Sequence, residues 1–169
     1  YVEMGFTGVK YDPVMPMSAF DPRQLSLEAL SNAELVTKNM REAVGDKCDL
    51  LIGTHGQMTT SSAIRLARRL EQYDPLWFEE PVPPGQSNAM TEVAKKTSIP
   101  IATGERLYTK FPFAEIIEKH AADVLQPDIA NAGGITELKK ISSMAESNNN
   151  QDDKPKDGEF PEGAGGVYQ

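Results

Sequence analysis

Trp77-Phe78-Glu79-Glu80-Pro81 is the stretch of sequence that decides the fold. An aromatic pair ends a short apolar run, two carboxylates follow at once, and a proline stops the run. The same order recurs at intervals of roughly 25 residues, which leaves room for one helix between successive strands. The polar residues just past these runs are His55, Glu79, Glu105 and Asp128. This is the rhythm of repeated strand–helix units, whose strand ends meet at one rim when they build a parallel barrel.

The whole chain fits about five such units. The expected strands are 8–11, 49–52, 76–78, 99–103 and 124–126. The expected helices are 31–44, 60–72, 88–96, 112–120 and a last one that follows Gly133-Gly134 and ends at Glu146. The sequence therefore predicts an α/β fold, a partial (β/α) TIM-type barrel. A closed barrel of eight units typically needs roughly 250 residues, and the 169 residues here are too few to close one.

Two segments lie outside this repeat. Residues 13–27 contain three prolines and are expected to form a long loop at the rim, placed to cover a site. Residues 147–169 are rich in Asn, Asp, Gly and Pro, and are expected to be a polar disordered tail. The predicted domain organisation is thus a barrel segment at 1–146 and a tail at 147–169.

Composition excludes several classes of partner. The formal net charge of −8 argues against a nucleic-acid partner. Apolar runs stay far below the roughly 20 residues of a transmembrane helix, so a membrane partner is not expected. Cys48 is the single cysteine, which rules out an internal disulfide framework and suits a reducing compartment. We therefore expect a cytoplasmic location and a small-molecule substrate.

The strand-end residues predict a particular chemistry. Two carboxylates on adjacent strands, Glu79 and Glu105, repel each other unless they share a proton or hold a cation. Oxygen ligands favour a hard ion such as Mg²⁺, and Lys10 and His55 are a plausible base and acid beside it. Each residue also has a structural interpretation as a surface lysine, a turn histidine or a capping acid. Asp128, for example, suits a turn in which it accepts backbone hydrogen bonds.

Together these motifs resemble the enolase superfamily, in its mandelate racemase-like branch, and most of all the acid-sugar dehydratases of the galactonate type. The resemblance covers about residues 1–146. The motifs that carry it are Gly5–Lys10, Thr54-His55-Gly56, Trp77–Pro81, Ile101–Arg106, and Leu125–Asp128 followed by Gly133-Gly134-Ile135.

The resemblance implies a barrel with a separate capping domain and an Mg²⁺ ion held by carboxylates of three successive strands. Glu79 and Glu105 match the second and third of these ligands. His55 matches an acid/base histidine, and Lys10 matches a lysine that faces the substrate. Asp128 matches an aspartate that orients a catalytic histidine on the following strand.

The implied substrate is a sugar acid, bound through its carboxylate, and Arg106 and Asp12 are assigned to its binding. A base removes the proton α to the carboxylate, which gives an enediolate. Loss of the β-hydroxyl then gives a 2-keto-3-deoxy acid.

The sequence departs from this pattern at several points. Gly53 stands where the first metal ligand is expected, so either His55 joins the coordination sphere or the metal site is weakened. The partner histidine of Asp128 is missing, and His120 falls at a helix end on the wrong side. The capping domain, the first strand and the final two strands are also expected to be missing.

Three alternatives therefore stay open beside the dehydratase. The chain is a catalytically inactive truncated fragment or pseudo-enzyme, or it is a racemase or epimerase that uses the same enediolate. The third is that its open sheet edges pair with another chain, which would make a homo-oligomer.

Overall fold

The computed structural model describes residues 1–14 and 24–149. Five strands form one parallel sheet in the order β1-β2-β3-β4-β5. They are β1 (Gly8–Tyr11), β2 (Asp49–Gly53), β3 (Trp77–Glu79), β4 (Ile101–Thr103) and β5 (Val124–Leu125). The predicted α/β fold, a partial barrel of about five strand–helix units, is confirmed.

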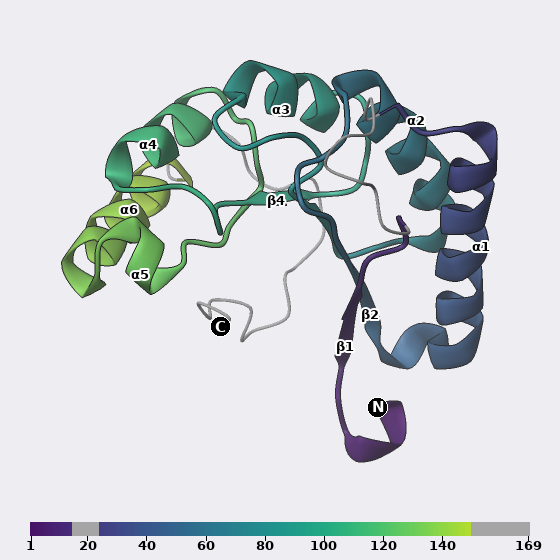
Figure 1. The fold of residues 1–169 in the computed structure, drawn as a ribbon. Coiled ribbons are helices and arrows are strands. Elements are labelled where there is room, and N and C mark those ends of the chain that lie inside the picture. Colours follow the sequence, from purple (N-terminus) through teal and green to yellow (C-terminus); the bar gives the residue numbers. More distant parts are fainter. Residues whose placement is uncertain (15–23, 150–169) are drawn as a thin grey trace.

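Helices cover one face of this sheet. In Figure 1 they form an arc outside the strands, which lie on the inner side of that arc. They are α1 (Leu27–Val44), α2 (Thr60–Leu70), α3 (Ser87–Ala94), α4 (Lys110–Glu118), α5 (Ile129–Ala132) and α6 (Ile135–Asn149). Short 3₁₀ turns span Val2–Met4, Gly45–Lys47 and Glu71–Tyr73. Within the described residues, no helix combines the length and the apolar character needed to cross a membrane.

The hydrophobic core lies between the sheet and the helices. Ile52, Phe78 and Ile101 come from three successive strands and are completely buried there. Leu66 of α2 and Phe113 of α4 are equally buried and belong to the same cluster. Because side chains alternate along a strand, the residues next to these three point to the other, inner face of the sheet. The inner face therefore carries the polar strand-end side chains.

The boundaries of α1 and α6 differ from the prediction, and the short helix α5 was not predicted. Helix α1 begins four residues earlier than expected, because Ser26 is its cap and accepts a hydrogen bond of 3.1 Å from the Ala29 N–H. Helix α5 was not predicted, since four residues are too few to show a periodic pattern. Helix α6 continues past Glu146 to Asn149. Most of the predicted rim loop and of the predicted tail, residues 15–23 and 150–169, lies outside the described residues.

Arg41 on α1 joins the helical layer to the amino-terminal end of the sheet. Its guanidinium donates four hydrogen bonds of 2.9–3.0 Å to backbone carbonyls just before β2 and β3. The acceptors are Gly45, Cys48, Tyr73 and Asp74. These carbonyls precede their strands and have no partner in the ladder, so a single planar donor satisfies them together.

We predict that Arg41→Lys lowers the free energy of unfolding by about 1–3 kcal/mol, because an ammonium keeps the charge but cannot present four donors in one plane. Urea denaturation of the purified chain measures the loss. Arg68→Lys is the matched control, since Arg68 donates one exposed contact of 3.5 Å. Equal effects of the two substitutions would contradict the role given to Arg41.

Candidate functional site

Lys10 and Glu79 form the centre of the inner face. The Lys10 ammonium lies 2.7 Å from Oε1 and 2.6 Å from Oε2 of Glu79. The Glu79 side chain is only 4% exposed, whereas that of Lys10 is 51% exposed. Gly53 pairs with Glu79 in the β2–β3 register, so the Lys10 side chain passes over Gly53 on its way from β1 to β3. Three strands therefore contribute to one ion pair, in which the carboxylate is buried and the ammonium is half-exposed.

Glu80 is a functional candidate that the pattern of strand-end residues does not single out. Its side chain is completely buried, and its backbone has a φ of 46°, a conformation that non-glycine residues seldom adopt. Oε1 accepts hydrogen bonds from the Thr103 hydroxyl at 2.6 Å and from the Gly104 N–H at 2.9 Å. The position of Glu80 directly after Glu79 could have indicated a separate role, because successive side chains of an extended segment point to opposite sides.

Arg106 completes the arrangement around Glu80. One of its terminal nitrogens donates to the His55 carbonyl at 2.7 Å and approaches Oε2 of Glu80 at 3.4 Å. Gly56 leaves the space for this guanidinium, because a Cβ at that position would collide with it, and its φ of +63° also favours glycine. The guanidinium thus links the loops after β2 and β4. Its predicted contact with substrate stays a prediction.

His55 and Asp12 form a second pair, at the ends of β2 and β1. His55 Nδ1 and Asp12 Oδ2 lie 3.2 Å apart, and the histidine side chain is 64% exposed. The other oxygen of Asp12 accepts a hydrogen bond from the Val14 N–H. Burial raises the pKa of Asp12 above its ordinary value, while the Val14 N–H and the His55 ring offset part of that rise. An exposed imidazole beside a half-buried carboxylate is suited to proton transfer.

Glu105 and Asp128 lie farther along the same edge. The Glu105 carboxylate is 3.9 Å from Nε of Arg106, and its side chain is 39% exposed. Asp128 caps helix α5 by accepting from the Asn131 N–H at 2.7 Å, as its structural interpretation suggested. The Asn131 amide in turn donates to the Glu105 carbonyl at 2.9 Å. Asn131 therefore ties the loop that carries Glu105 to α5.

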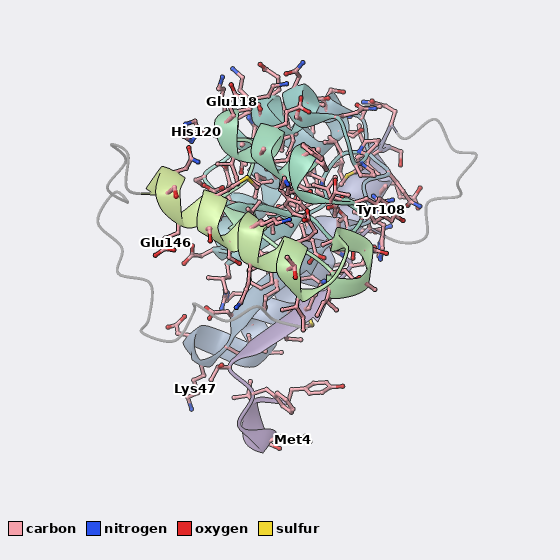
Figure 2. The ribbon with its side chains drawn as sticks, turned by 90° about the vertical axis from the view of Figure 1, so that its left-hand side faces the viewer. Met4, Lys47, Tyr108, Glu118, His120 and Glu146 are labelled. Carbon is pink, nitrogen blue, oxygen red and sulfur yellow. The ribbon has the colours of Figure 1, made fainter. Side chains whose placement is uncertain are left out.

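The predicted site residues fall into separate contacts rather than one cluster. Lys10 meets Glu79, His55 meets Asp12, Glu105 meets Arg106, and Asp128 caps a helix. Among residues 1–14 and 24–149, no group of three or more His, Cys, Asp or Glu side chains is placed to hold a metal ion. Figure 2 shows His120 and Tyr108 on opposite sides of the molecule. Since Tyr108 follows β4 and His120 precedes β5, His120 lies away from the strand-end edge.

Comparison with known proteins gives consistent results. The family described as enolase C-terminal domain-like matches residues 1–151. The chain is 35% identical over 147 residues to the D-gluconate/D-galactonate dehydratase of Picrophilus torridus, which covers 87% of this chain and 37% of the relative. It is 36% identical over 149 residues to the D-xylonate dehydratase of Haloferax volcanii, covering 85% of this chain and 36% of the relative.

A solved structure agrees with these sequence matches. A candidate mandelate racemase/muconate lactonizing enzyme from Burkholderia SAR-1 superimposes with a TM-score of 0.84 at 59% sequence identity, over 88% of this chain and 37% of that one. The chain thus spans little more than a third of the length of the relatives it matches.

We predict that Glu80→Gln lowers the free energy of unfolding by about 1–3 kcal/mol, because an amide replaces a buried acceptor that serves several donors. Urea denaturation measures it, and Glu42→Gln is the control because Glu42 makes only an exposed contact of 3.7 Å with Lys38. A Glu80→Gln chain as stable as the unmodified one would contradict the proposed linkage of the strand-end loops.

We also predict that the Asp12 carboxyl titrates above the ordinary aspartate pKa of about 3.9. The folded chain then holds this proton to a higher pH than the unfolded chain does. The contribution of Asp12 to the free energy of unfolding consequently falls as the pH rises from about 4 to the raised pKa, and Asp12→Asn removes that contribution. Carbon-13 NMR titration of the carboxyl measures the midpoint.

The variant His55→Ala should raise the Asp12 pKa further, because the ring is one of the groups that lower it. An Asp12 midpoint at or below the ordinary value in the unmodified chain would refute the first statement, and a midpoint that does not rise in His55→Ala would refute the second.

Proposed function

The chain belongs to the enolase C-terminal domain-like family, and on that premise we propose that it carries part of the active site of a sugar-acid dehydratase. The observation that supports this most is its identity of 35–36% to two sugar-acid dehydratases over about six-sevenths of its length. The strand-end edge adds chemical support, because it presents a lysine, a histidine and a buried carboxylate on neighbouring strands.

The proposed reaction begins with removal of the proton α to the substrate carboxylate and ends with loss of the β-hydroxyl, which gives a 2-keto-3-deoxy acid. Lys10 and His55 are the proposed base and acid, since both lie at this edge with exposed side chains, and the Lys10 ammonium has to release a proton before it acts as the base. A proton α to a carboxylate is very weakly acidic, so positive charge must lie near the developing enediolate. Arg106 and Asp12 are proposed to contact the substrate. Asp128, at the end of β5, is proposed as the aspartate that orients a catalytic histidine.

Similarity to an enolase-type dehydratase implies Mg²⁺ as the metal ion. The oxygen ligands of the strand-end edge can therefore be compared with those that Mg²⁺ requires. Glu79 and Glu105 are oxygen ligands of the right kind. Gly53 offers no side-chain oxygen, and Asp49 lies at the opposite end of β2. Glu79 is moreover already paired with Lys10. The described residues do not fit a complete Mg²⁺ site, so the roles proposed here rest on the protein's own groups.

This misfit favours a second candidate function, in which the chain is catalytically inactive. A racemase or epimerase would begin with the same proton abstraction but retain the hydroxyl. The three candidates differ in observable products, since only the dehydratase forms a keto acid and only an active enzyme exchanges the α-proton with solvent.

The test is incubation of the purified chain with D-gluconate, D-galactonate and D-xylonate in D₂O, with and without Mg²⁺. Proton NMR follows α-proton exchange and epimers, and a colorimetric assay follows 2-keto-3-deoxy acids. We expect keto acid from at least one substrate, and a loss of at least about 100-fold in His55→Asn, as is typical when a general acid–base group is removed.

Exchange or epimers without keto acid would replace the dehydratase by the racemase or epimerase. If neither exchange nor product appears, the inactive alternative is supported and the proposed activity of this chain is wrong. Lys139→Met serves as the control for nonspecific effects, because Lys139 lies on α6, away from the strand-end edge.

A further inference from the structure

We propose that the ammonium group of Lys10 is the resident cation of the strand-end edge and takes the place beside Glu79 that a divalent metal ion would otherwise occupy. The inference concerns which cations this edge binds, and it does not depend on which reaction, if any, the protein catalyses.

The first support is the geometry of the pair. The Lys10 nitrogen lies within 2.7 Å of both Glu79 oxygens; it donates a hydrogen bond to Oε1, while its contact with Oε2 is one of charge alone and Oε2 accepts no hydrogen bond from the described residues. Glu79 is almost fully buried, and a buried carboxylate needs a compensating charge. Lys10 supplies that charge from within the chain.

The second support is Gly53. A Cβ at this position would lie 2.5 Å from Cε of Lys10, 3.3 Å from Cγ and 3.5 Å from Cδ. The stem of Lys10 therefore occupies the volume that any side chain at position 53 would need. Gly53 is not among the glycines with positive φ, so the requirement here is for space and not for backbone freedom. Gly53 thus offers no side-chain oxygen and leaves room for the lysine stem in the same place.

The third support is how the other carboxylates of this edge are paired. Asp12 faces His55, Glu80 accepts from Thr103 and Gly104, and Glu105 faces Arg106. Each already has a cationic or hydrogen-bonding partner within the chain. A divalent ion would have to displace Lys10, because an ammonium and a metal ion at the same carboxylate repel each other.

The test is isothermal titration calorimetry of the purified chain with MgCl₂ and, as a second probe, MnCl₂. The unmodified chain is expected to show no saturable binding at millimolar metal. Lys10→Met, which keeps the apolar stem, is expected to bind either ion at least tenfold more tightly. Lys10→Met combined with Glu79→Gln should lose this binding again. Lys47→Met is the matched control, since Lys47 lies before β2 at the other end of the sheet.

A second variant removes the pair without removing the lysine. Gly53→Ala places a methyl group where Cε of Lys10 lies, so it should displace the ammonium and lower the melting temperature measured without metal. Saturable Mg²⁺ binding by the unmodified chain at millimolar metal would overturn the proposal, and this outcome is measured on the unmodified chain alone. Because a glycine-to-alanine change also stiffens the unfolded chain, its effect is compared with that of the same change in the Lys10→Met background, and equal effects in the two backgrounds would overturn the proposal as well.

Discussion

The parallel ladder of five strands is the constraint on which the rest of the structure depends. Because all strands run in one direction, every loop that follows a strand lies at the same edge. The register places Gly53 beside Glu79 and Lys10 beside Leu51, so the Lys10 side chain can cross one strand and reach the next. Residues that are distant in sequence thus become neighbours through backbone hydrogen bonding, and their side chains need only reach across the inner face.

The two ends of the sheet use arginine in different ways. At the amino-terminal end, Arg41 satisfies carbonyls that the ladder leaves free, and it contacts backbone alone. At the carboxyl end, Arg106 joins the His55 carbonyl to the buried carboxylate of Glu80. The first arrangement stabilises the layers against each other. The second fixes loops that carry titratable side chains. In barrel folds, residues at the amino-terminal end of the strands typically serve stability, and residues at the carboxyl end serve chemistry.

Much of the fold was predictable because short apolar runs and helical periodicity alternate regularly along the chain. The site was predictable only in part. Position at a strand end correctly marked Lys10 and Glu79 as residues of one edge. The pattern does not tell, however, how far each side chain extends or which neighbour it contacts. It could not show that Lys10 would extend over Gly53, or that Arg106 would turn toward Glu80. These contacts depend on two glycines whose missing side chains make room for longer ones.

The close approach of Lys10 to Gly53 also makes the two positions dependent on each other in the order in which they can change. A carboxylate introduced at position 53 forces the flexible lysine stem to leave its present path over β2, or requires a shorter side chain at position 10. Shortening position 10 first leaves Glu79 without its charge partner until position 53 changes. Either single change disturbs the contact between Lys10 and Glu79. The effect of a substitution at one of the two positions therefore depends on which residue stands at the other.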